Sequence, residues 1–289
     1  MSFYKYVWFC LILFSFNLMF CSSIYASSEV LTGQDNVNSC GCLQNQSIMN
    51  PFFKAADEDC DLPVTEDCDL PVAPELNKFD KAVLNVCGGW VNTPRADLFK
   101  VMLDNTEYKE YVDKLYEGLN HQVFTPNASL EKFKDELTKL WFGQHAFAHI
   151  MCGQPGELKL GGMHFFGRYI QAQENNWAGR HYDSTVIDEV SDKVYTIGVI
   201  FRNSNNHLAI DPRKGCDFTH ADEILLNATK AYKEFSKHTK LSDDNLRKCL
   251  YRSNGVTYTF VAKNNAIFTF YSTLTPMCDP GETECNCVK

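Results

Sequence analysis

Between positions 76 and 140, apolar residues recur every three or four positions, which is the spacing of one buried face of a helix. The segment that begins Asn127-Ala-Ser-Leu-Glu offers a helix start. Leu130, Phe133, Leu137 and Leu140 then form one apolar stripe. The pattern predicts core-forming helices over residues 76–140 and shows no chemistry there.

The second half of the chain changes to strand-like patterns. VYTIGVIFR (194–202) predicts a strand, NSNN a turn, and HLAID (207–211) a second short strand. An amphipathic helix is predicted over 221–238, and the alternating residues of 256–272 predict a β-hairpin. Helices followed by antiparallel strands indicate an α+β fold, with a helical N-terminal part and β-sheet subdomains after it.

The first 26 residues are typical of a secretory signal peptide. Lys5 precedes an apolar run from Val7 to Phe20, and Ile24-Tyr25-Ala26 is a plausible cleavage site. The run is short for a bilayer span, which needs roughly 20 residues. An uncleaved membrane anchor is the alternative.

Residues 27–75 are expected to form an acidic, cysteine-containing linker. Glu58 to Ala73 holds a tandem repeat, EDCDLPVT and EDCDLPVA, and two short copies are too few for a solenoid. An extended linker is the simpler interpretation, with calcium or partner binding as the alternative. We expect a helical part over 76–140, a main folded part over 141–275 and a cysteine-containing tail over 276–289.

The cysteine content favours an oxidising compartment. Of 13 cysteines, 11 follow Ala26, which indicates disulfide bonds and a secreted protein. Because 11 is odd, at least one thiol is expected to stay free, and Cys152 is the candidate.

The charge distribution limits the class of ligand. The net charge of −9 argues against a protein that grips nucleic acid along a long basic face. From Trp141 to the end, however, the 16 acidic residues are balanced by 16 basic ones. This half of the chain can therefore still contact a few phosphates.

His145, His149 and His164 are the candidates for chemistry. His145 and His149 form HxxxH, which with Cys152 could bind zinc on one helix face, as in a zinc-dependent hydrolase. Position 146 is alanine, however, where zinc hydrolases of the HExxH type need glutamate. Taken alone, His145 is typical of a partly buried packing residue.

The third interpretation is acid-base catalysis without a metal. Two histidines with pKa values near neutrality can deprotonate a nucleophile and protonate a leaving group in one step. Cleavage of RNA by its own 2′-hydroxyl needs such a pair and a cation. Gly161-Gly162, just before His164, would let a phosphate come close to backbone amides.

The segment from His149 to His164 resembles the histidine loop of EndoU-type endoribonucleases, which include animal, bacterial-toxin and nidoviral enzymes. Thr269-Phe270-Tyr271 resembles the C-terminal motif of that family, and Lys214 resembles its lysine ahead of a helix. The resemblance covers residues 141–275.

The resemblance implies an enzyme that cleaves single-stranded RNA, with uridine as the expected site, and leaves 2′,3′-cyclic phosphate ends. His149 would be the general base, His164 the general acid and Lys214 the cation that stabilises the phosphorane; the two histidine roles could exchange. The substrate-binding residues it implies are Gly161, Gly162, Thr219, Thr269 and Tyr271.

The sequence departs from the family at two positions. Ala148 replaces a glutamate found in many animal members, which puts metal dependence in doubt. The family usually has a serine near the lysine that recognises uracil, and Thr219 is only a substitute for it in this sequence. Arg213 is an alternative phosphate cation, whereas Arg168 and Arg180 are typical of surface charges.

The expected partners are single-stranded RNA and an inhibitor or immunity protein, with no membrane contact once the signal peptide is removed. No cofactor is expected to be required, and stimulation by Mn²⁺ is left open. The rival from another class is a non-catalytic RNA- or protein-binding member of the same fold.

Overall fold

The structure is a computed structural model that describes residues 49–54, 70–183, 188–191, 193–276, 278 and 285–288. All of them belong to one compact unit, Gln46–Lys289. The expected signal peptide and most of the tandem repeat lie outside the described residues. The helices are α1 (Lys78–Cys87), α2 (Ala96–Asp104), a 3₁₀ turn (Thr106–Tyr108), α3 (Lys109–Gly118), α4 (Leu130–Phe142), a π-helix (Ala148–Cys152), α5 (Phe166–Glu174) and α6 (Ala221–His238).

The helices α1–α4 form where the three- and four-residue periodicity predicts them. Asn77 caps α1 in a capping box with Asp80, and Ser129 caps α4 by accepting from Lys132 N–H. The predicted stripe is largely buried, with Phe133, Leu137 and Leu140 inaccessible to solvent. The core built by these helices supports the start of the π-helix.

Nine strands form three antiparallel sheets in the part of the chain that the structure describes. They are β1 (Gln154–Pro155), β2 (Leu160–Gly161), β3 (Ala178–Arg180), β4 (Glu189–Val190), β5 (Val194–Arg202), β6 (Leu208–Asp217), β7 (Arg247–Ser253), β8 (Val256–Lys263) and β9 (Ala266–Ser272). β1 pairs with β2, β5 pairs with β3, β4 and β6, and β8 lies between β7 and β9. The α+β class is therefore confirmed.

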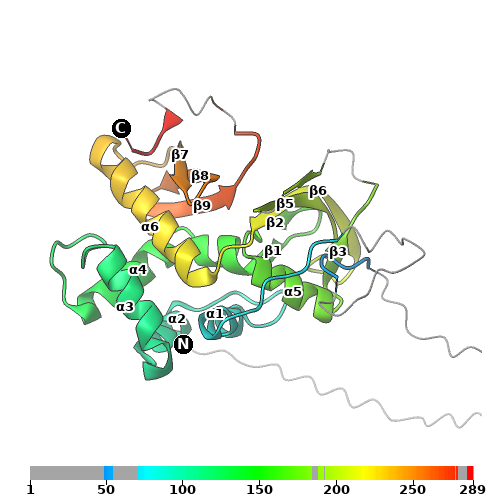
Figure 1. The fold of residues 1–289 in the computed structure, drawn as a ribbon, viewed down its shortest axis with the longest axis horizontal. Coiled ribbons are helices and arrows are strands. Elements are labelled where there is room, and N and C mark those ends of the chain that lie inside the picture. The colour runs from blue at the N-terminus through cyan, green and yellow to red at the C-terminus, as the bar shows by residue number, and fades with distance from the viewer. Residues whose placement is uncertain are drawn as a thin grey trace, which may run out of the picture. The chain divides into compact units, whose positions relative to one another are not determined.

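The two larger sheets agree in part with the sequence predictions. β5, α6 and the β8–β9 hairpin lie where they were expected, and α6 lies alongside the β7–β8–β9 sheet (Figure 1). The strand expected over 207–211 is longer, since β6 runs on to Asp217. β7 was missed, because its sequence RKCLYRS carries charges at three of seven positions and shows no clear alternation.

The prediction that Cys152 is the free thiol is wrong. Cys152 forms a disulfide with Cys87, and the buried Cys216 is the free cysteine among the described residues. Two further disulfides join Cys249 to Cys287 and Cys278 to Cys285.

The Cys87–Cys152 bond ties the last residue of the π-helix to the end of α1 and closes a loop with a sequence separation of 65. In the chain-entropy account, a loop of this length stabilises the fold by about 4 kcal/mol. The covalent link therefore helps to fix the segment that carries His149.

The expectation that Arg168 is a surface charge is also wrong. Its side chain is fully buried, and its guanidinium lies over the rings of Trp90 and Trp177 at 5.5 and 5.1 Å. It donates to the carbonyls of Cys152, Gly88 and Gly89 over 2.8–2.9 Å. One buried cation thus joins the end of the π-helix to the loop that follows α1.

Arg180 is likewise not a free surface charge, because its side chain is only 14% exposed and pairs with Asp188 at 3.1 Å. No helix among the described residues is both long enough and apolar enough to span a bilayer.

Candidate active site

His149 lies in the π-helix after α4, and hydrogen bonds fix its backbone on both sides. Its N–H donates to the carbonyl of His145 over 2.9 Å, and its carbonyl accepts from Met163 N–H over 2.7 Å. The ring Nδ1–H donates to Oε1 of Gln154 at 3.0 Å. Single π-turns are rare in proteins as a whole but frequent at functional sites. This one sets the direction in which the His149 imidazole points.

His164 lies opposite His149 at the end of the β1–β2 hairpin. Its N–H donates to the carbonyl of Ile150 over 2.7 Å, and its ring Nδ1–H donates to the carbonyl of Gly215 over 2.8 Å. Because a carbonyl can only accept, the neutral ring carries its proton on Nδ1 and leaves the Nε2 lone pair free. The two imidazole centroids are 5.7 Å apart.

The Gly-Gly pair has a packing role that the sequence did not reveal. Gly162 has φ +62°, and a Cβ added there would lie 1.7 Å from the carbonyl oxygen of His149. Only glycine permits this approach, because any side chain would push the loop away from the π-helix. Gly161 pairs with Gln154 across the β1–β2 hairpin, and Gln154 is the residue that accepts the hydrogen bond from the His149 ring.

Lys214 shares a cavity of about 230 Å³ with His164 and Tyr271. It lies on β6 rather than in a turn, and its ammonium pairs with Asp211 Oδ2 at 3.1 Å. The same carboxylate oxygen accepts from Leu160 N–H at 3.2 Å, so Asp211 fixes the cation against the base of the histidine hairpin. Sequence reasoning missed Asp211, although its spacing of three residues from Lys214 was visible.

Arg213 also lines this cavity, but its charge is partly engaged. Its guanidinium donates to Glu189 Oε1 at 2.7 Å and to the Thr275 hydroxyl at 3.1 Å. Both cations of the cavity are thus paired with a carboxylate, Lys214 with Asp211 and Arg213 with Glu189.

The residues of β9 reach the site unequally. The Tyr271 ring stacks on His164 with centroids 5.1 Å apart at 26°. A shift in register leaves Phe268 unpaired between the Val261–Thr269 and Ala262–Ile267 pairs. The centroid of its ring lies 5.9 Å from that of the His149 ring. Sequence reasoning missed Phe268, because strict alternation does not anticipate such a bulge.

Two buried hydroxyls of β9 have no hydrogen-bond partner among the described atoms. Thr269 is 7% exposed and lies outside the lining of the cavity, whereas Ser272 is 5% exposed and lines it. Buried polar groups are seldom left unpaired, so the Ser272 hydroxyl is available to a group that enters the cavity.

Thr219 does not reach the cavity lining. Its N–H donates to Asp217 Oδ1 at 3.2 Å, and its hydroxyl lies 3.4 Å from that of Tyr258. Burial raises the pKa of Asp217 to about 6, against the opposing hydrogen bonds from Tyr258 and Thr219. Thr219 thus belongs to a cluster of polar side chains, with Asp217 and Tyr258, that lies outside the cavity lining.

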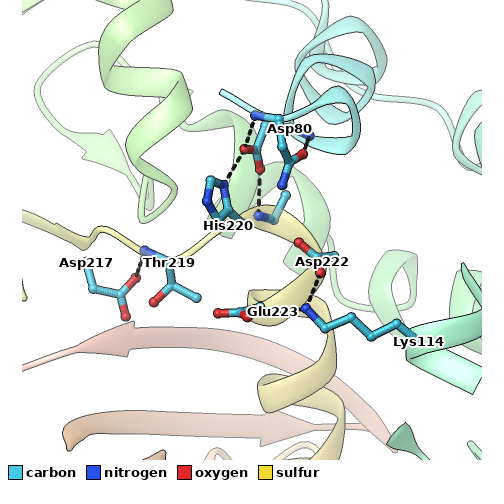
Figure 2. A network of polar contacts seen from close by, with 9 residues as sticks. Asp80, Lys114, Asp217, Thr219, His220, Asp222 and Glu223 are labelled. Atoms are coloured by element: carbon cyan, nitrogen blue, oxygen red, sulfur yellow. Dashed lines mark hydrogen bonds and ion pairs between the residues drawn. The ribbon is translucent and has the colours of Figure 1, made fainter. Parts of the chain in front are cut away.

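Figure 2 shows how the segment after Lys214 is anchored where α6 begins. The buried Asp80 accepts from His220 Nδ1 at 2.6 Å and from Ala221 N–H at 2.8 Å, while Lys114 pairs with Asp222 at 2.8 Å. These contacts join α1 and α3 to the start of α6, and so fix the connection that follows the strand of Lys214.

The electrostatic environment favours neutral histidines. Burial is the main cause that lowers the pKa of His164 to about 3; the nearby His149 and Lys214 act in the same direction, and the bond to Gly215 opposes them. The pKa of His149 is also lowered, mainly by burial, with Gln154 opposing and Lys214 adding to the effect. His164 is thus neutral over the whole physiological range.

The zinc interpretation is wrong. The sulfur of Cys152 is bonded to Cys87 and cannot act as a thiolate ligand. His145 is exposed on the surface, contrary to the expectation that it packs in the core. In the described part of the chain, no group of three or more His, Cys, Asp or Glu side chains is placed so that it could hold a metal ion.

Comparison with known proteins identifies one matching family model. Residues 143–274 match the family model described as bacterial EndoU nuclease. No curated protein matches the chain.

Two solved structures are similar in part. XendoU, described as a splicing-independent snoRNA-processing endoribonuclease, is 14% identical, with 68% of this chain and 77% of that chain covered and a TM-score of 0.44. Nsp15, the endoribonuclease of Middle East Respiratory Syndrome Coronavirus, is 15% identical, with 48% and 37% covered and a TM-score of 0.32. The family model confirms the resemblance to EndoU-type endoribonucleases over residues 143–274.

Proposed function

We propose that this chain is an endoribonuclease that cleaves single-stranded RNA by attack of the 2′-hydroxyl on the adjacent phosphate. The observation that carries the proposal is the pair of histidines, 5.7 Å apart between ring centroids, beside a cavity that holds the ammonium of Lys214. An imidazole that accepts a proton, one that donates a proton and a fixed cation are the groups that this transesterification needs.

The hydrogen bonds favour His164 as the general base and His149 as the general acid. The bond to Gly215 fixes the His164 proton on Nδ1, and its low pKa keeps the Nε2 lone pair free to take the proton of the 2′-hydroxyl. Protonated His149 would then donate from Nε2 to the departing 5′-oxygen, since its Nδ1 is engaged with Gln154. This is the exchange of roles that the sequence left open.

In the reaction, the 2′-oxygen forms a bond to phosphorus as its proton passes to His164. Lys214 stabilises the charge that develops on the phosphorane. The bond from phosphorus to the 5′-oxygen breaks as His149 supplies a proton, which leaves a 2′,3′-cyclic phosphate and a 5′-hydroxyl. Turnover is complete when His164 returns its proton and His149 is protonated again.

Recognition of a pyrimidine, with uridine as the expected base, is assigned to the same cavity. Tyr271 offers an aromatic wall, and Ser272 offers a buried hydroxyl without a partner among the described atoms. One hydroxyl can donate to a carbonyl of uracil and accept from its N3–H. Secretion is proposed from the leader pattern and from the disulfides.

The proposal is tested with a short RNA that holds one uridine, incubated with the mature protein in the presence of EDTA. We expect cleavage after the uridine and a product that carries a 2′,3′-cyclic phosphate, identified by mass spectrometry. Absence of cleavage, even after Mn²⁺ is restored, would leave a protein that binds RNA or another ligand without cutting it.

The pH dependence of kcat/KM follows from the two histidine pKa values. Activity requires His164 neutral and His149 protonated in the free enzyme. Since the pKa of His149 lies below 6.5 and that of His164 is about 3, kcat/KM should reach its maximum between these values and fall tenfold per pH unit on the alkaline side. Steady-state kinetics from pH 3 to 9 would measure this. A maximum above pH 7 would contradict the lowered pKa of His149.

A further inference from the structure

The strand that carries Lys214 is interrupted by a β-bulge. Two residues of β5, Ile197 and Val199, pair with Lys214 and Asp211, so one residue of β5 lies opposite two of β6. One of those two is Pro212, which has no N–H to donate and is found in sheets at edges and bulges. In a regular strand, side chains three positions apart point to opposite faces. The extra residue turns Asp211 and Lys214 to the same face, where they form an ion pair.

The bulge lets one carboxylate hold both the cation and the histidine hairpin. Asp211 Oδ2 pairs with the Lys214 ammonium at 3.1 Å and accepts from Leu160 N–H at 3.2 Å. Its Oδ1 accepts from Arg213 N–H at 3.3 Å. Leu160 lies in β2, on the segment that leads to His164. The position of the ammonium relative to His164 therefore depends on Asp211.

The two cations of the cavity are held differently. The side chain of Lys214 is 15% exposed and that of Asp211 is 9% exposed, whereas that of Arg213 is 41% exposed. Glu189, the partner of Arg213, comes from β4 and also accepts from Thr275 in the segment after β9. Charge pairs that are partly buried are screened less by salt and water than exposed pairs. Lys214 is therefore the cation with the more closely defined position.

The ammonium can hold the carboxylate and still act on a substrate. Lysine has three N–H donors, of which Asp211 occupies one. The other two can donate to phosphorane oxygens while the ion pair restrains the flexible side chain. Lys214 also contributes to the lowered pKa values of His149 and His164. Its charge thus lies within electrostatic reach of both rings.

We propose that Asp211 is a positioning residue for the cleavage reaction, which acts through Lys214 and touches no substrate atom itself. It holds the ammonium where the charge of the phosphorane develops. The inference rests on the proposed function and adds to it the group that orients the cation. Because that charge exists only in the transition state, loss of Asp211 should lower kcat and leave KM nearly unchanged.

A double-mutant cycle separates this role from a contribution to the fold. Asp211→Asn removes the charge and keeps an oxygen that can accept from Leu160 N–H. With uridylyl-3′,5′-adenosine as substrate, we expect kcat to fall about tenfold and KM to change by less than about twofold. Lys214→Ala should lower kcat roughly 10²–10³-fold. Where Lys214 is already replaced by alanine, Asp211→Asn should cause no further loss, since the group that it positions is absent.

Glu189→Gln is the matched control, because it removes the carboxylate that pairs with Arg213, the other cation of the cavity. Its effect on kcat should be the same with and without Lys214→Ala, and thermal unfolding checks that every variant is folded.

Three results would overturn the positioning role: no loss from Asp211→Asn, a loss that persists in the Lys214→Ala protein, or a loss that lies in KM alone. A Glu189→Gln effect that disappears with Lys214→Ala would do the same, since the cycle would then report on the whole cavity. If the unmodified protein cleaves no RNA, the proposed function itself fails and the role of Asp211 with it.

Discussion

Replacing His164 by alanine is expected to lower RNA cleavage by roughly 10²–10⁴-fold, the range for a well-placed acid or base. The change removes the imidazole whose Nε2 is left free to accept a proton because its Nδ1–H donates to the Gly215 carbonyl. The protein should stay folded, because a net contribution of about 1 kcal/mol from one hydrogen bond shifts Tm by only a few degrees in a domain of this size. Steady-state cleavage and thermal unfolding measure the two effects.

His207→Ala is the control, since His207 is exposed in the turn between β5 and β6. The two histidine roles can be distinguished with the aryl ester uridine 3′-(4-nitrophenyl phosphate), because its leaving group, 4-nitrophenolate, departs without a proton. His149→Ala should therefore lose far less activity on that ester than on a dinucleotide, whereas His164→Ala should lose activity on both. The opposite pattern would assign the general base to His149. Equal losses of the two variants on both substrates would show that the acid and base roles are not divided between the two histidines.

Replacing Gly162 by alanine is expected to damage both stability and activity. The new Cβ would lie 1.7 Å from the carbonyl oxygen of His149, at a backbone φ of +62° that L side chains rarely adopt. We expect a loss of about 3 kcal/mol in the free energy of unfolding, near the upper end for single substitutions. A displacement of His149 by about 1 Å should cost on the order of 10²-fold in turnover.

Gly161→Ala is the comparison, because its Cβ would meet the Gln154 side chain at 3.2 Å and the Gln154 carbonyl only at 3.5 Å. Its loss in Tm should be clearly smaller. A Gly162→Ala protein with Tm and turnover equal to those of the unmodified protein would show that the loop does not press against the π-helix as described.

The sequence predicts regular elements well where one periodicity dominates. α4, α6 and the β8–β9 hairpin have clear apolar patterns, and their bounds agree closely with expectation. β7 has no such pattern and forms because β8 lies beside it, so its existence depends on a partner strand. The π-helix is likewise held by contacts with distant segments, among them the disulfide to Cys87.

The same limit applies to the candidate site. The histidines, Lys214 and Tyr271 were visible because they belong to a recognisable pattern. Asp80, the partner of His220, was not, since 140 residues separate the two in the chain. The buried position of Arg168 also escaped, because a charged residue is expected at the surface unless its distant carbonyl partners are known.

The order in which the groups of the site occur along the chain has a consequence during protein synthesis. Lys214 and Tyr271 come from strands far beyond the histidine loop, and β9 is the last strand of the structure. Folding must wait for contacts between such distant segments, which are slow to form. For the proposed nuclease, a nascent chain still threaded through the ribosome lacks the aromatic wall beside His164 until β9 has emerged.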